Sequence, residues 1–198
     1  MNPDNWIETI FRAVTQSPHP RAPDPDQFQA TSVMALVALD PVPSLIFIQK
    51  ADREGYPWRN QMAFPGGHMD KKDRSTRQTA LRELREEMGI QAGNVRVAGS
   101  IGHFQTINQK DIEVFVGIWN QKETIVYDTA EIARVFFIPL DFLIQAHTES
   151  GYHGKMPHVL ELTYVYEDVT IWGVTAKILH HLLEILIPSR SGRVGAGP

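Results

Sequence analysis

The most constraining feature of this sequence is a predicted helix with clear start and stop signals. Ser75 suits the N-cap position, and Gln78 three residues later completes a capping box. Gly89 is the residue type that most readily adopts the left-handed conformation that ends a helix. These signals predict a helix over residues 76–88. Three acidic residues lie near its predicted end: Glu83, Glu86 and Glu87.

The three glutamates are unfavourable for the helix that carries them. Acids at i, i+3 and i+4 share one side of a helix and repel one another by roughly 0.2–0.5 kcal/mol per pair. The negative end of the helix dipole disfavours them further. Leu81, Leu84 and Met88 fall on the opposite side, which is consistent with an amphipathic helix whose acidic face is solvated. The second interpretation is that the acids hold a cation.

The residues around the helix favour the cation. Gly66 and Gly67 allow the backbone to pass close to a ligand and leave a carbonyl oxygen exposed. Together with three carboxylates they would form an all-oxygen site, the donor set that suits Mg²⁺ or Mn²⁺. Mg²⁺ bound by carboxylates usually shares its remaining positions with water and substrate phosphates. Arg82 and Arg85, beside the acids, could hold a carboxylate or contact a phosphate.

Composition excludes several other classes of protein. With 198 residues, 42% of them hydrophobic, the chain is long enough for one domain with a sizeable core. A net charge of -4 argues against general nucleic-acid binding, and the absence of cysteine excludes disulfides and thiolate metal sites. The sequence has no apolar run of about 18 residues and no basic N-terminal region typical of a signal peptide. We therefore expect a cytoplasmic protein that does not associate with membranes.

The remaining sequence predicts an α+β fold, with mixed strands around substantial helices. The expected domain organisation is an N-terminal helix and Pro-rich linker at 1–29, a main domain at 30–187 and a flexible tail at 188–198. Four aromatic residues are expected in the core: Trp119, Phe136, Phe137 and Trp172. Helices are predicted at 4–16, 141–147 and 175–186. Strands are predicted at 31–40, 44–50, 95–101, 111–120 and 133–140, with a final hairpin at 158–168 and 169–173.

The glycines and the acidic helix together resemble the Nudix box. That pattern is G-x5-E-x7-R-E-U-x-E-E-x-G-U, where U is a bulky aliphatic residue. RELREEMGI, residues 82–90, fits the second half at every fixed position. In the first half, Asp73 stands where the pattern has glutamate, and Arg82 follows Gly67 by fifteen residues, one more than the pattern requires.

The departures resemble the coenzyme A diphosphatase branch of the Nudix superfamily. That branch shares the inserted residue and the polar residues Asp70, Asp73 and Ser75. It also tends to carry the late segment I-W-G-x-T-A, here Ile171, Trp172, Gly173, Thr175 and Ala176, so the resemblance spans residues 31–187. The branch often has a Leu-Arg-x-His-x-Gly-Gln segment before the box. Residues 57–61 of this chain keep Arg59 and Gln61 but lack the histidine and the glycine.

The resemblance implies a Nudix fold, an α/β/α sandwich with a mixed central sheet, and a hydrolase dependent on Mg²⁺ or Mn²⁺. Such an enzyme would cut the diphosphate linkage in a nucleoside diphosphate linked to another group, here coenzyme A or an acyl-CoA. The altered segment before the box leaves an ADP-ribose or nucleotide-sugar diphosphatase as the alternative. A Nudix-fold binding module without turnover is a third interpretation, although such modules typically lose box carboxylates that are all present here.

Site residues follow from the same resemblance. Glu83, Glu86 and Glu87 are expected to bind the metal, with the carbonyl oxygen of Gly66 or Gly67 as a further ligand. Arg82 is expected to orient a glutamate or to pair with Asp73. Glu131, just before a predicted strand, is the candidate general base, and the other candidates are Asp111 and Glu113.

Several other residues have two interpretations. Trp58 and Arg59 could stack on an adenine and clamp a phosphate, or could pack beneath the box. Lys155, in a loop that also contains His153 and His158, could meet a phosphate if that loop closes over the substrate. Adjacent histidines at 180 and 181 suggest packing rather than a metal site. The N-terminal helix could exchange with a partner in a homodimer.

Overall fold

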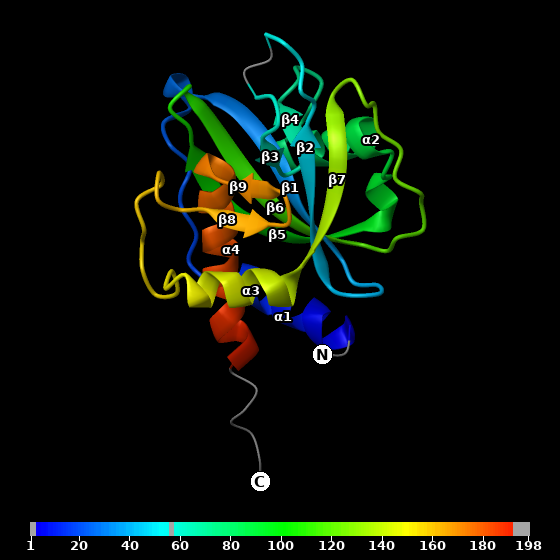
Figure 1. Cartoon of the computed structure of the whole chain (residues 1–198). Helices are drawn as coiled ribbons and strands as arrows, with labels where there is room; N and C mark the ends of the chain where they lie inside the picture. Colours follow the sequence, from blue (N-terminus) through cyan, green and yellow to red (C-terminus); the bar gives the residue numbers. More distant parts are fainter. Residues whose placement is uncertain (1–2, 56–57, 192–198) are drawn as a thin grey trace.

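The chain folds around a seven-stranded mixed sheet (Figure 1). The computed structural model describes residues 3–55 and 58–191, and the side chains of residues 5–55 and 58–188. The strands of the sheet are β1 (Gln29–Ala38), β2 (Ser44–Lys50), β3 (Met62–Ala63), β4 (Gly66–His68), β5 (Val95–Gln105), β6 (Lys110–Trp119) and β7 (Ile132–Pro139). Their order is β3-β2-β1-β6-β5, with β4 paired to β1 and β7 paired to β2.

Strand β1 pairs with different strands along its length, and this pairing determines which strands lie together at each end of the sheet. β1 runs parallel to β6 throughout, from Gln29 opposite Lys110 to Ala38 opposite Trp119. On its other side, the first part of β1 pairs with β4, whereas its last residues pair with β2. The glycine strand β4 and the start of β6 therefore lie at the same end of the sheet.

Helices cover both faces of this sheet (Figure 1). Helix α2 (Thr76–Met88) lies on one face, above a buried cluster that includes Leu36, Ile46 and Leu84. Helices α1 (Pro3–Gln16), α3 (Leu140–Glu149) and α4 (Gly173–Ser191) pack on the other face, over a cluster that includes Phe47 and Leu182. The predicted α+β class and the α/β/α sandwich with a mixed central sheet are confirmed.

The ends of α2 follow the local signals in the sequence. The Ser75 hydroxyl accepts a hydrogen bond from the Gln78 N–H at 3.2 Å. The Gln78 side chain accepts from the Arg74 N–H rather than from Ser75, so the predicted capping box is formed in only one direction. Gly89 ends the helix in the left-handed conformation, with φ of 74°, and its N–H donates to the Arg85 carbonyl.

The N-terminal helix is a part of the core and not a separate appendage. Trp6, Ile10, Ala13 and Val14 are buried, and α1 packs against α4 and β5 of its own chain. The Pro-rich segment that follows is extended except for the short 3-10 helix η1 (Pro25–Gln27). The boundary predicted after residue 29 therefore marks a connection between elements of one core.

Some predicted elements differ in the structure. Residues 158–163 form a turn at 159–161 and otherwise irregular structure instead of a strand, and the final hairpin is the short pair β8 (Tyr164–Tyr166) and β9 (Val169–Ile171). Helix α4 continues to Ser191, so residues 188–191 of the predicted tail are helical, and 192–198 lie outside the described residues. Phe137 and Trp172, which were expected in the core, are 41% and 51% exposed, whereas Phe136 and Trp119 are buried.

Candidate active site

Glu87 is buried, which excludes the interpretation that all three acids share a solvated face. Its side chain is 7% exposed, and the helix that carries it packs against β1 and β4. One carboxylate oxygen lies 2.6 Å from the Lys50 Nζ, and the other accepts a hydrogen bond of 2.8 Å from the Gly66 N–H. Glu83 is 17% exposed and Glu86 is 49% exposed. Side-chain exposure therefore increases from Glu87 through Glu83 to Glu86.

Arg82 connects the remaining acids. Its Nη1 donates to Glu83 and to Glu86, each at 2.8 Å. Its Nη2 donates to Asp73 at 2.9 Å and to the His68 carbonyl oxygen at 3.0 Å. Hydrogen bonding from Arg82 lowers the pKa of Asp73 to about 2. Both expected roles of Arg82, orienting a glutamate and pairing with Asp73, are present together.

The two glycines of β4 are required by close contacts on either side. Gly66 has φ of 153°, and a Cβ at this position would overlap the backbone of Ser32 and Val33 in β1. A Cβ on Gly67 would lie under 3.0 Å from the Glu83 carboxylate. Burial raises the pKa of that carboxyl group. Glycine at both positions therefore allows β4 to lie directly beside the acids of α2.

The residue types here suit a divalent cation, although the oxygens of the three carboxylates do not all lie within 4.8 Å of one another in the described part of the chain. The donors are three carboxylates beside a glycine backbone, which is the hard-oxygen chemistry of Mg²⁺ and Mn²⁺. The charges of the carboxylates are compensated by Arg82 and Lys50. Because Gly67 contributes no side chain, nothing at that position separates the Glu83 carboxylate from the β4 backbone.

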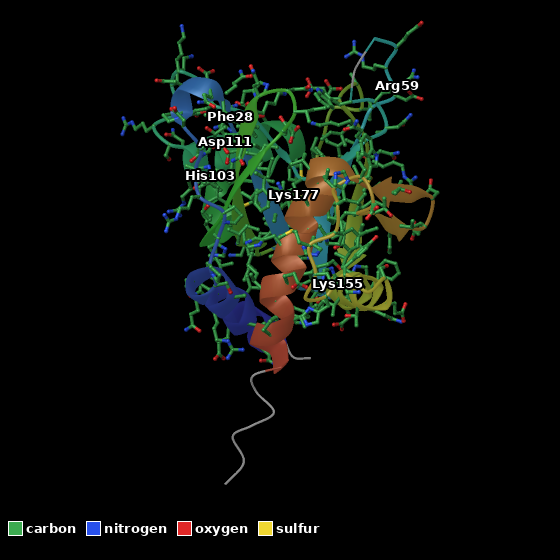
Figure 2. All side chains as sticks on the ribbon, turned by 90° about the vertical axis from the view of Figure 1, so that its left-hand side faces the viewer. Phe28, Arg59, His103, Asp111, Lys155 and Lys177 are labelled. Carbon is green, nitrogen blue, oxygen red and sulfur yellow. The ribbon has the colours of Figure 1, made fainter. Side chains whose placement is uncertain are left out.

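The alternative base candidates, Asp111 and Glu113, belong to a hydrogen-bonded cluster at the start of β6. The Thr76 hydroxyl donates to the Glu113 carboxylate. His103, on β5, contacts both acids: its Nδ1 lies 2.7 Å from Asp111, and its Nε2 lies 3.8 Å from Glu113 (Figure 2). The sequence analysis did not single out His103, because its neighbourhood depends on the pairing of β5 with β6.

Trp58 lies beside a lysine that the sequence analysis also did not identify. The Nζ of Lys110 lies 5.4 Å from the centre of the Trp58 ring. Burial, together with the nearby charge of Lys110, lowers the pKa of His68. Arg59 is exposed and projects from the edge of the molecule (Figure 2). Pro57, in the same segment, lies outside the described residues.

The structure places Glu131 next to the strand that carries Lys50. Its carbonyl oxygen accepts a hydrogen bond of 2.9 Å from the Ala51 N–H, and the following residue, Ile132, pairs with Lys50 across β2 and β7. The Glu131 side chain itself is exposed. The Glu131 backbone is thus adjacent, across the β2–β7 pair, to Lys50, which is the ion-pair partner of Glu87.

The structure does not bring Lys155 to the acidic helix. Figure 2 shows Lys155 beside α3, at the far end of the molecule from Arg59. The loop that contains it is attached through His153 to Glu184 of α4, on the face of the sheet opposite α2. A loop fixed there does not cover the glutamates of α2, so its expected contact with a phosphate has no support from this geometry.

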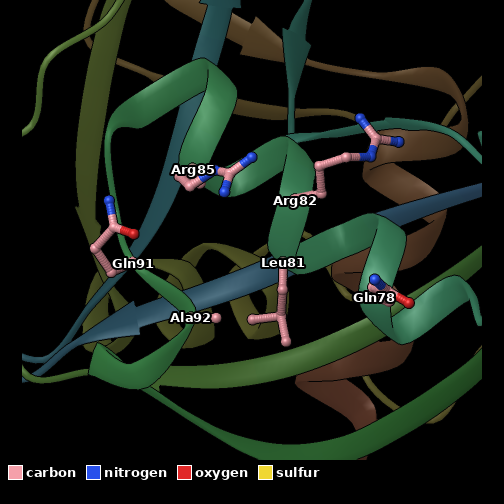
Figure 3. A pocket seen from close by; sticks show the side chains of 6 residues that line it. All are labelled: Gln78, Leu81, Arg82, Arg85, Gln91 and Ala92. Atoms are coloured by element: carbon pink, nitrogen blue, oxygen red, sulfur yellow. The ribbon is translucent and has the colours of Figure 1, made fainter. Parts of the chain in front are cut away.

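A hollow of about 300 Å³ lies on the outer side of α2 (Figure 3). It is bounded by the helix and by the residues that lead into the 3-10 helix η2 (Ala92–Asn94). Arg82 borders both this hollow and the acid network. The residues that line it are Gln78, Leu81, Arg82, Arg85, Gln91 and Ala92.

Comparisons with known proteins show which proteins this chain is similar to. The family model described as the NUDIX domain matches residues 28–160. An uncharacterized Nudix hydrolase, NudL, of Pectobacterium atrosepticum is 32% identical over 177 residues, which cover 87% of this chain and 90% of the relative. The NudL of Yersinia enterocolitica is 33% identical over 172 residues, covering 82% and 86%.

Solved structures show the same fold. A MutT/nudix family protein from Enterococcus faecalis matches with a TM-score of 0.51 at 17% identity, over 89% of this chain and 72% of that one. This likeness concerns the fold alone. Within the described part of the chain, no helix has the length and hydrophobicity needed to cross a membrane.

Proposed function

Since the chain belongs to the Nudix family and is a Nudix hydrolase, we propose that it hydrolyses the diphosphate linkage of coenzyme A or an acyl-CoA with Mg²⁺ or Mn²⁺. The observation that carries this proposal is the arrangement of Arg82, Asp73 and the three glutamates of α2 beside a glycine backbone. The carboxylates supply the anionic oxygens that a divalent metal ion needs, and the Arg82 guanidinium keeps these carboxylates in place.

The metal ligands in this proposal are Glu83, Glu86 and Glu87, with the carbonyl oxygen of Gly66 or Gly67. When bound, the cation neutralises the diphosphate and acidifies the attacking water. Arg82 holds Glu83 and Glu86 in place, and Lys50 with the Gly66 N–H holds Glu87. Because phosphoryl transfer depends mainly on positioning and electrostatics, these fixed carboxylates are the principal contribution of the protein.

The proposed reaction is a hydrolysis in which water supplies all the atoms added. The water oxygen bonds to one phosphorus while the bond from that phosphorus to the bridging oxygen breaks. Glu131 accepts a proton from the water, and the bridging oxygen leaves on the other phosphate. From coenzyme A, the products are 3′,5′-ADP and 4′-phosphopantetheine.

The choice of coenzyme A rests on two segments that resemble that branch of the family. The late segment forms β9 and the start of α4, with Ile171 buried and Trp172 exposed. β9 packs near β3, which leads directly into the glycines of β4. The late segment therefore lies near the strand that precedes the glycines, which supports a part for it in substrate binding.

The decisive experiment incubates the purified protein with coenzyme A, ADP-ribose and a GDP- or UDP-sugar, each with and without Mg²⁺ or Mn²⁺. Products are identified by mass spectrometry, and Glu87→Gln is the inactive control. Metal-dependent 3′,5′-ADP from coenzyme A supports the proposal. If AMP forms from ADP-ribose and coenzyme A stays intact, the chain is an ADP-ribose or nucleotide-sugar diphosphatase. The altered residues 57–61 leave that alternative open. Ligand binding without turnover would favour a binding module.

A second experiment tests Arg59, the exposed arginine that precedes the Nudix box. Coenzyme A carries a 3′-phosphate that dephospho-coenzyme A lacks, and we assign Arg59 as its contact. Arg59→Ala should raise the KM for coenzyme A roughly tenfold and leave that for dephospho-coenzyme A nearly unchanged, because one charge-assisted contact is lost. Arg53→Ala, an exposed arginine of the same segment, is the matched control. Equal effects on both substrates would exclude this role.

A further inference from the structure

A second group of metal-binding side chains lies on the face of the sheet opposite α2. His147 of α3, His153 of the following loop and Glu184 of α4 place one ligand atom each within 4.8 Å of the others. The His147 Nε2 and the His153 Nδ1 lie 2.7 Å and 2.8 Å from the same oxygen of Glu184. Three segments far apart in the sequence therefore converge on one carboxylate.

His180 adds an independent sign that this group is incomplete. Its ring is 4% exposed, and its Nε2 is buried without a hydrogen-bond partner among the described residues. It precedes Glu184 by four residues on α4, so both side chains leave the same side of the helix. The ring lies 4.9 Å from that of His147, centre to centre. A buried imidazole nitrogen without a hydrogen-bond partner is unusual and calls for an explanation such as an ordered water or an ion.

The surroundings of these side chains suit metal ligation. The Nδ1 of His147 lies 2.8 Å from the Tyr164 hydroxyl, an outer partner of the kind that fixes the orientation of a ligating histidine. Glu184 also accepts hydrogen bonds from the Gly154 N–H. His153 is 43% exposed and leaves a path from solvent.

We propose that His147, His153 and Glu184, with the His180 ring packed beside them, bind a divalent transition metal of the zinc type. Imidazole nitrogens with one carboxylate suit zinc and its neighbours rather than Mg²⁺, which prefers oxygen donors alone. Such an ion would tie the loop after α3 to α4. That loop, residues 150–163, has no regular secondary structure, so a metal bridge through His153 would determine its position.

The test uses the full chain, freed of metal with EDTA, in a background that lacks the acidic site of α2: Glu83→Gln, Glu86→Gln and Glu87→Gln. Binding of Zn²⁺ is measured by calorimetry, and Co²⁺ is used for its visible absorption, which reports imidazole ligation. We expect one equivalent of either metal to bind. His153→Gln should weaken binding at least tenfold, whereas His158→Gln, an exposed histidine of the same loop, should leave it unchanged.

Two outcomes would overturn the proposal. The first is the absence of metal binding in this background, which would mean that the contacts are hydrogen bonds alone. The second is equal affinity in the His153→Gln and His158→Gln variants. His180→Gln, checked for folding by circular dichroism, should also weaken binding. Since this background carries no acidic site, the result does not depend on whether the chain hydrolyses coenzyme A.

Discussion

Glu87 illustrates how a charge is kept inside this protein. Its carboxylate is almost fully buried, yet both oxygens have partners, the Lys50 ammonium on one side and the Gly66 N–H on the other. Removing one partner of a buried ion pair usually costs more than the pair contributes, because the other charge is left unpaired. A divalent cation bound near Glu87 would compensate the charge of this carboxylate in addition to Lys50.

Lys50→Met tests this account. Without metal, the variant should lose about 1–3 kcal/mol of unfolding free energy, because a buried charged hydrogen bond is lost. Mg²⁺ should restore a part of that loss, because it compensates the same carboxylate. Urea unfolding with EDTA and with Mg²⁺ measures both quantities, with Lys71→Met, an exposed lysine, as control. An equal loss under both conditions would contradict the link to the metal.

Asp73 makes the stability depend on pH. Its pKa is lowered from 3.8 to about 2 by the hydrogen bond from Arg82, so its contribution is complete above pH 3.8 and disappears as the pH falls through about 2. Asp73→Asn should be less stable than the wild type at pH 7 by about 1–3 kcal/mol. The difference should shrink between pH 4 and pH 2 in thermal unfolding. A constant difference over this range would exclude the assignment.

At the scale of elements, the approach of β4 to α2 decides the geometry of the acids. The strand is only three residues long, but it pairs with β1 and places Gly67 against the Glu83 carboxylate. The capped ends of α2 determine where the helix begins and ends, and β4 determines what the glutamates face. Both are needed because a metal ligand displaced by about 1 Å can cost roughly 100-fold in rate.

Gly67→Ala should therefore lower kcat by roughly 10- to 100-fold. The added methyl group overlaps the Glu83 carboxylate and forces it, or β4, to move. Gly93→Ala in η2 is a matched control, because a Cβ at that position meets no atom within 4 Å. Product formation in the presence of Mg²⁺ gives the comparison. Similar activity of the two variants would mean that Glu83 tolerates displacement.

At the scale of the whole molecule, α1, α3 and α4 support the face of the sheet that α2 does not cover. Ile10 of α1 is fully buried in the same cluster as Phe47 of β2 and Leu182 of α4. The N-terminal helix thus packs on the sheet that carries the candidate active-site residues. In this single chain α1 packs on α4 and β5, and exchange of the helix with a partner stays a prediction.

Ile10→Ala should lower the unfolding free energy by about 2–5 kcal/mol, the usual cost of a cavity at a fully buried isoleucine. Ile107→Ala, at a fully exposed position, should have almost no effect. Denaturant unfolding at two protein concentrations adds a second readout. A midpoint that rises with concentration would show that folding is coupled to association with a partner chain.

The sequence determined what depends on near neighbours: the ends of α2, the spacing of its acids, most strands and the family resemblance. Hydrogen bonds at a helix end and contacts at i+3 and i+4 involve residues a few positions apart, so they can be read directly. The tertiary structure alone decided that Glu87 is buried against Lys50, 37 residues away, and that His103 meets the acids of β6. It also placed Lys155 far from the acids and His153 beside Glu184. Those neighbours result from strand register and from helix packing across the sheet, which no local pattern encodes.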